Sequence, residues 1–244
     1  MCWSAPASII LTSAGLGGTI YAVKQKKSKL LWLPLLYFSL MEGLQVVQYF
    51  FIDQCGLYIN QLLTVLGFIH IAFQPFFINA FALYFVPKKF AKKIAPWVYT
   101  ICFLATVAML LQLYPFHAVG SSASACIPGQ QEMCGNNLCT VSGEWHLAWN
   151  IPLSMYPHSI YISSFFLFPL LYGSWKITLV SFLIGPLLVS SLSSNINERP
   201  AIWCFLSVAY ILIIILSPLQ KWLRVKKWYF WKFKSKKIKN NKNK

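Results

Sequence analysis

The basic residues of this 244-residue chain occupy every second gap between its hydrophobic runs. Four lysines lie within 24–29, four within 88–93, one at Lys176, and eleven of the remaining lysines and arginines follow position 220. Arg199 is the single basic residue elsewhere. Because Lys and Arg in short loops are retained on the cytoplasmic side of a membrane, this alternation predicts a membrane protein and also its orientation.

The hydrophobic runs themselves predict helices. Apolar residues make up 57% of the chain and charged residues 11%, a balance that suits a bilayer better than a single water-soluble core. Seven runs approach the ~17–25 residues that cross a bilayer, at 7–23, 30–52, 61–86, 96–113, 147–172, 177–192 and 201–219. Backbone groups in hydrocarbon must bond within their own segment. We therefore predict an all-α, seven-transmembrane-helix bundle over 1–219, in a plasma or inner membrane, with its N-terminus outside and its C-terminus cytoplasmic.

The tail, 220–244, is basic and contains four adjacent aromatic residues at 228–231. This composition suits the anionic lipids of an inner leaflet. The net charge of +16 is explained by the cytoplasmic gaps and this tail, so no nucleic-acid partner is expected. The lipid bilayer is the expected partner.

The cysteines gather on the predicted outer side. The long outer loop, 114–146, contains no Lys or Arg and holds three of them. An oxidising compartment favours disulfides between such thiols. The candidates are Cys2, Cys55, Cys126, Cys134, Cys139 and Cys204. Six cysteines allow 15 pairings, and the sequence does not choose among them. Cys102 lies apart from these and is predicted to be an apolar filler.

Glu42 is the only acidic residue inside a predicted span. Burying a carboxyl there costs at least ~2.5–3.5 kcal/mol unless it is protonated or paired. The predicted helix directions place Glu42, His70 and His158 each about ten residues, or roughly 15 Å, below the outer end of its span. Gln45 and Gln74 extend polarity on the same helices. We expect these five side chains to form one intramembrane polar cluster.

Several chemistries fit this cluster. Glu42 could exchange a proton with His70 or His158 as near-neutral partners, which suits a transporter or sensor. Two imidazoles and a carboxylate are also a ligand set for iron or zinc, which suits a membrane enzyme. A haem between the two histidines is a further alternative. A protonated Glu42 could instead tie helices together through hydrogen bonds. No motif identifies a cofactor.

The leading hypothesis is transport or sensing of a small ligand, a proton or a metal ion. A membrane-embedded enzyme that depends on a metal or haem is the alternative. A retinal protein is not favoured, because the last span, 201–219, has no lysine to form a Schiff base.

Four segments resemble an uncharacterised family of small multi-pass membrane proteins, chiefly bacterial. They are Met-Cys-Trp-Ser at 1–4, Met-Glu-Gly-Leu-Gln at 41–45 together with 52–55, His-Ile-Ala-Phe-Gln-Pro-Phe-Phe-Ile-Asn at 70–79, and Ser-Gly-Glu-Trp-His-Leu-Ala-Trp at 142–149. The resemblance covers the first five predicted spans. It implies no activity.

Overall fold

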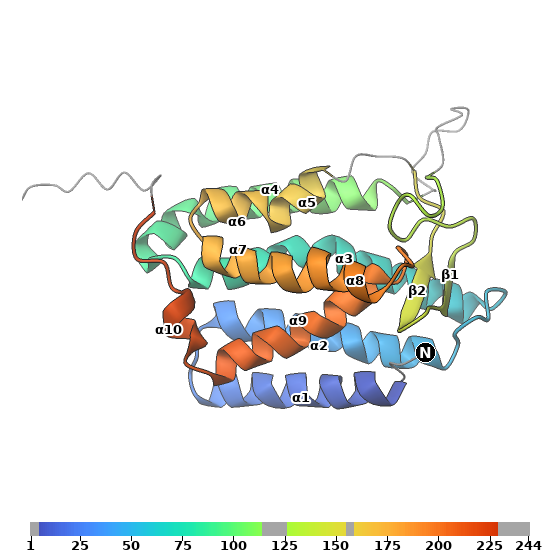
Figure 1. Ribbon diagram of the computed structural model, residues 1–244, viewed down its shortest axis with the longest axis horizontal. Coiled ribbons are helices and arrows are strands. Elements are labelled where there is room, and N and C mark those ends of the chain that lie inside the picture. Colours follow the sequence, from blue (N-terminus) through green and yellow to red (C-terminus); the bar gives the residue numbers. More distant parts are fainter. Residues whose placement is uncertain (1–4, 114–125, 155–158, 229–244) are drawn as a thin grey trace, which may run out of the picture.

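The computed structural model describes residues 5–113, 126–154 and 159–228, and it is mostly helical (Figure 1). Six helical segments among these residues are long and apolar enough to cross a membrane. They are α1 (Ala5–Lys24), α2 (Lys29–Tyr49), α3 (Tyr58–Tyr84), α4 (Lys88–Leu110), the segment Trp175–Leu192 and α9 (Arg199–Leu216). Six of the seven predicted spans coincide with these segments.

The fifth of these segments contains a change of helix type. It begins as α7 (Trp175–Phe182), continues as the π-helix η2 (Leu183–Val189) and ends as α8 (Ser190–Leu192). The shorter elements are β1 (Cys139–Ser142), β2 (Leu147–Asn150), α5 (Ser159–Phe165), α6 (Leu167–Leu171) and α10 (Leu219–Leu223). The long helices lie side by side, and α5 and α6 follow each other in line, with α5 packed against α4 (Figure 1).

The prediction of a helix over 147–172 is wrong at its beginning. Residues 147–150 form β2, which pairs antiparallel with β1 so that Cys139 faces Asn150. A short apolar run does not distinguish a buried strand from a helix, so tertiary partners decide. Here the amide of Asn60 on α3 bonds both the N–H and the carbonyl of Thr140 at 3.0 Å. Among the described residues of 147–172, the helical part consists of α5 and α6.

The loops rich in basic residues meet at one end of the bundle, opposite the hairpin of β1 and β2 (Figure 1). Lys27 donates to the carbonyl of Ile215, and Arg224 donates to the hydroxyl of Tyr84 at 2.8 Å. These bonds bring together segments from the first basic gap, the end of α3 and the C-terminal region. The predicted orientation remains a proposal, and this shared basic end supports it.

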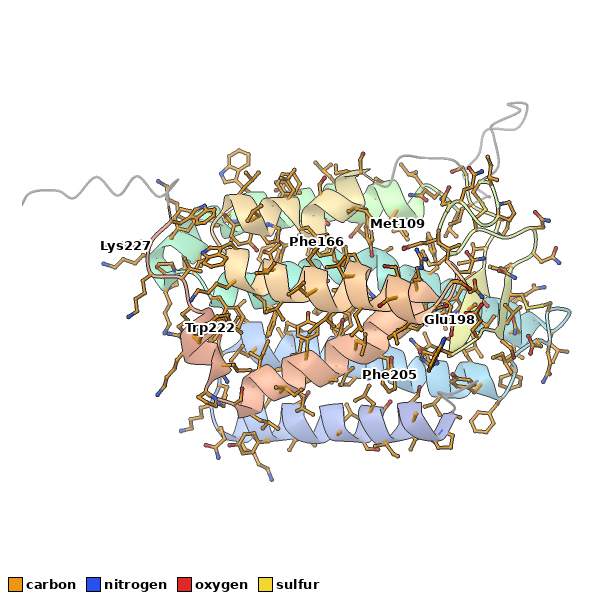
Figure 2. The ribbon with its side chains drawn as sticks, viewed as in Figure 1. Met109, Phe166, Glu198, Phe205, Trp222 and Lys227 are labelled. Carbon is orange, nitrogen blue, oxygen red and sulfur yellow. A yellow bond between two sulfur atoms is a disulfide. The ribbon has the colours of Figure 1, made fainter. Side chains whose placement is uncertain are left out.

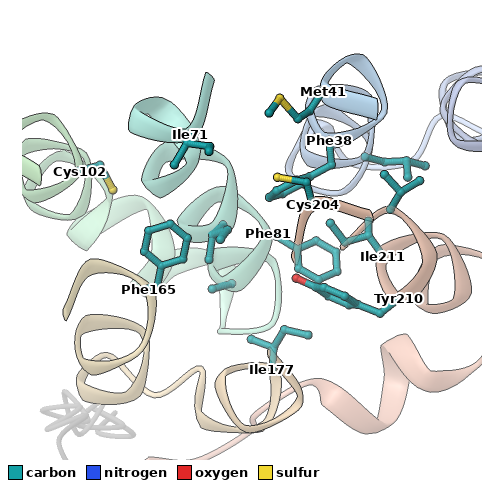
Figure 3. Close-up of a cluster of buried hydrophobic side chains, with 14 of the residues drawn as sticks. Phe38, Met41, Ile71, Phe81, Cys102, Phe165, Ile177, Cys204, Tyr210 and Ile211 are labelled. Carbon is teal, nitrogen blue, oxygen red and sulfur yellow. The ribbon is translucent and has the colours of Figure 1, made fainter. Parts of the chain in front are cut away.

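The apolar core lies between α2, α3, α7 and α9 (Figure 3). Phe38 of α2, Phe81 of α3 and Ile211 of α9 are almost completely buried. The rings of Phe81 and Tyr210 meet nearly edge to face at 6.2 Å. Large apolar side chains are exposed on other faces, such as Ile20 of α1, which lipid would cover.

Two disulfides hold the end of the bundle opposite the basic loops. Cys55 pairs with Cys139, which joins the loop after α2 to β1, and Cys126 pairs with Cys134. The inclusion of Cys204 among the disulfide candidates was wrong, because it is a buried free cysteine. Its position in the second turn of α9 turns the thiol toward α3 rather than the loops. Cys2 lies outside the described residues.

We predict a specific count of reactive thiols. In a Cys2→Ser background six cysteines remain, of which Cys102 and Cys204 are free. Denatured, unreduced protein should therefore take up two maleimide labels per chain, and reduced protein should take up six, as measured by intact mass. More than two labels before reduction would contradict the pairing.

Candidate functional site

Glu198 fastens the hairpin to the bundle. Its side chain is completely buried just before α9. The carboxylate accepts hydrogen bonds from the backbone N–H groups of Glu144 at 3.1 Å and Trp145 at 2.6 Å, and also from His146. Ser193 adds a hydroxyl at 2.8 Å. Figure 2 shows Glu198 beside the hairpin. The donors that surround this acid identify it as a structural residue.

Asp53 acts in the same way on the other side of the hairpin. Its carboxylate accepts the N–H of Ser142 at 2.8 Å and the hydroxyl of Ser142 at 2.5 Å. The backbone N–H of Asp53 in turn donates to the carbonyl of Thr140 at 3.1 Å. The hairpin is thus held by two carboxylates and a disulfide, and it covers one end of the helices.

His146 points from the hairpin into the bundle. Its Nδ1 shares a hydrogen bond with the hydroxyl of Tyr49 on α2, and its ring meets Phe205 of α9 edge to face at 5.9 Å. Burial lowers the pKa of His146 from 6.5 to about 3. The imidazole is therefore neutral near pH 7.

Four polar side chains on α1 and α2 form a group that we call the Glu42 centre: Ser8, Thr12, Glu42 and Gln45. Both carboxyl oxygens of Glu42, both amide atoms of Gln45 and the two hydroxyls are buried without a hydrogen-bond partner among the described residues. The hydroxyl of Ser8 lies beside the Glu42 carboxyl. Buried polar groups are rarely left unpaired, so this concentration is unusual.

The close approach of three helices creates the centre. A Cβ added to Gly15 of α1 would lie 2.0 Å from the hydroxyl of Ser39 on α2 and 2.9 Å from Val208 on α9. A Cβ added to Gly43 of α2 would lie 3.5 Å from the methyl group of Thr12. Small residues therefore bring the backbones of α1, α2 and α9 together next to Glu42.

His70 and Gln74 make other contacts among the described residues. The ring of His70 stacks on Tyr37 with centroids 3.7 Å apart, and its Nε2 has no hydrogen-bond partner among the described residues. No hydrogen bond therefore joins His70 to Glu42. Gln74 donates instead to the thiol of Cys204 at 3.0 Å. His158 lies outside the described residues.

The predicted metal set of Glu42, His70 and His158 thus stays a prediction. Within the described ranges no three His, Cys, Asp or Glu side chains are grouped so that they could hold a metal ion. Ser8 and Thr12 were not among the predicted site residues. Their spacing of four residues, on the face of α1 that also carries Gly15, was the available signal.

These features define a helical bundle with candidate membrane spans and a covered polar centre. The chain belongs to a family of unknown function (DUF5765), whose model matches residues 6–224. This match confirms the resemblance to an uncharacterised family. No curated protein and no solved structure matches the chain.

The buried state of His146 predicts a pH dependence of stability. Its folded pKa, about 3, lies below the value of 6.5 that applies to the unfolded chain. Between these values only the unfolded state binds the proton, so stability falls as pH falls through this window. From pH 7 to pH 5 the wild type should lose about 2 kcal/mol more than His146→Gln, measured by denaturant unfolding in detergent. Equal losses in the two proteins would contradict the burial of a neutral imidazole.

Replacing Glu198 should loosen the hairpin. In Glu198→Gln one acceptor oxygen becomes an amide NH2, which cannot accept the hydrogen bonds that the carboxylate receives. We expect a loss of about 1–3 kcal/mol of unfolding free energy. Glu144→Gln, at an exposed position of the same hairpin, should change stability by less than ~0.5 kcal/mol. Similar losses of unfolding free energy in the two variants would argue against the role of Glu198 in holding the hairpin.

Proposed function

We propose that this chain is a multi-pass membrane protein that binds a proton or a small polar ligand at the Glu42 centre and acts as a sensor. The observation that carries the proposal is the buried Glu42 carboxyl, whose oxygens lack partners beside an equally unpartnered Gln45 amide. Leaving such groups unpaired in an apolar interior costs several kcal/mol (~2–7) for each group. A bound species that supplies donors and acceptors removes this cost.

The chemistry of the centre limits what it binds. Glu42 supplies a negative charge or, when protonated, a donor and an acceptor. Gln45 supplies two donor hydrogens and a carbonyl oxygen, and Ser8 and Thr12 add hydroxyls. This set suits a proton held with water, or a small ligand that carries its own donor hydrogens, such as an ammonium group. The oxygen and nitrogen atoms of these side chains are hard metal ligands, so the centre does not favour a soft metal such as copper(I).

Polar side chains continue from the centre toward the hairpin, and this arrangement favours sensing over transport. Toward the hairpin, α2 continues with Gln48 and Tyr49, which bond Leu63 and His146. Toward the basic end, large apolar side chains such as Phe38 and Ile211 are buried in the core (Figure 3). Transport would require this apolar half to open. In the predicted orientation the ligand arrives from outside.

Infrared difference spectroscopy of the purified protein tests the proposal. A titration from high to low pH should produce a carbonyl band of a buried protonated carboxyl, and Glu42→Gln should remove that band. Glu144→Gln, which alters an exposed carboxyl, is the matched control and should retain it. A spectrum in which Glu42→Gln and wild type coincide at every pH would overturn proton binding.

Proton flux separates sensing from transport. Protein is reconstituted in liposomes that contain a pH-sensitive dye, and a potassium diffusion potential is imposed. We expect no flux above that of empty liposomes for the wild type or for Glu42→Gln. Flux that requires Glu42 would replace the sensor interpretation with a transporter.

A further inference from the structure

A second site lies apart from the Glu42 centre. A cavity of about 400 Å³ opens between α3, α5, η2 and α9. This volume falls within the ~300–1,000 Å³ typical of small-molecule sites. Its walls are mostly aromatic and aliphatic and include Phe165, Phe166, Phe182 and Trp203. Figure 3 shows Phe165 facing α3 close to Ile71, another lining residue. Glu42 does not line this cavity.

The π-helix shapes one wall. Gly185 and Pro186 of η2 both line the cavity. A Cβ added to Gly185 would lie 1.8 Å from the ring of Trp203, so the ring fits against η2 only because this residue is glycine. Proline removes a backbone donor and favours a widened turn. Single π-helical turns within α-helices occur frequently at functional sites.

The cavity opens on the side that lipid would cover. Ile162 and Phe182 line it, and their side chains are 50% and 42% exposed. Both belong to helices of the apolar bundle rather than to the hairpin. An acyl chain could therefore enter sideways from the bilayer and place only part of its length inside.

The hairpin end of the cavity is charged with both signs. Arg199, at the start of α9, lines the cavity together with Glu132. It is the only one of the 21 basic residues outside the basic gaps and the tail. Its Nε donates to the carbonyl of Ser193 at 3.4 Å, which holds the guanidinium near the rim. Burial raises the pKa of Glu132, and the nearby Arg199 opposes that rise.

We infer that this cavity binds a phospholipid with a zwitterionic aminophosphate headgroup, that is, a phosphatidylethanolamine. Arg199 matches the phosphate, which guanidinium groups recognise through paired hydrogen bonds. Glu132 matches the primary ammonium group. One acyl chain occupies the aromatic cavity. A purely anionic lipid would meet repulsion from Glu132, and a choline lipid has no N–H to donate to it. The inference is independent of the function proposed for Glu42.

Native mass spectrometry of the full-length chain tests this site. Delipidated protein is mixed with equal amounts of phosphatidylethanolamine, phosphatidylcholine and phosphatidylglycerol that have identical acyl chains. The wild type should retain phosphatidylethanolamine best. Arg199→Gln should weaken binding of all three lipids, by about tenfold for phosphatidylethanolamine. Lys88→Gln, which removes a charge at the opposite end, is the control and should bind as the wild type does.

Glu132→Gln provides the second variant, so the inference stays testable if Arg199→Gln fails to fold. It should reduce phosphatidylethanolamine binding to the level of phosphatidylcholine and leave phosphatidylcholine binding unchanged. Correct disulfide pairing of each variant is verified by the count of two free thiols in the Cys2→Ser background. Equal retention of the three lipids by the wild type would overturn the inference. A lipid preference that survives both substitutions would also overturn it.

Discussion

A bundle surrounded by lipid has no bulk water to bond its polar groups, so each buried donor or acceptor needs a partner inside the protein. Most of the polar side chains described above satisfy this requirement. Glu198 collects backbone N–H groups, and Asn60 bonds both sides of Thr140. Asn79 donates to the carbonyls of Pro75 and Ser164 and accepts from Tyr172. The Glu42 centre stands out against this background because it concentrates unpaired groups in one place.

The helices were predictable because their signal is local. Each of six spans is a long apolar run, and the basic gaps between them mark the same end of the bundle. The burial of Glu42 and Gln45 also followed from their positions, since both lie inside such a run. The buried residues of α2 recur at helical spacing along one face, and this spacing is visible in the sequence.

The remaining features depend on contacts between distant segments. Residues 147–150 are as apolar as a membrane helix. They form a strand because their partner strand is held by the Asn60 amide, which donates to and accepts from the backbone of Thr140, and by the disulfide of Cys139. Nothing in the sequence distinguishes Glu198 from the other acidic residues, and only the folded hairpin brings three backbone N–H donors to its carboxylate. The number of residues from the outer end of each span places His70 at the same depth in the membrane as Glu42. Depth alone does not determine which way a side chain points. His70 turns to Tyr37 instead.

The two sites that we propose lie on either side of α9. Cys204 of α9 lies within electrostatic range of Glu42 and also accepts the hydrogen bond of Gln74, a lining residue of the lipid cavity. One hydrogen bond, from Gln74 to Cys204, therefore joins a residue of the cavity wall to a neighbour of Glu42.

The most direct measurement is an experimental density map of the protein in a lipid nanodisc, at a resolution that shows ordered water. The account predicts density that does not belong to the protein, within hydrogen-bonding distance of both the Glu42 carboxyl and the Gln45 amide. A dry contact, in which these two side chains bond each other or another side chain and leave no such density, would contradict it.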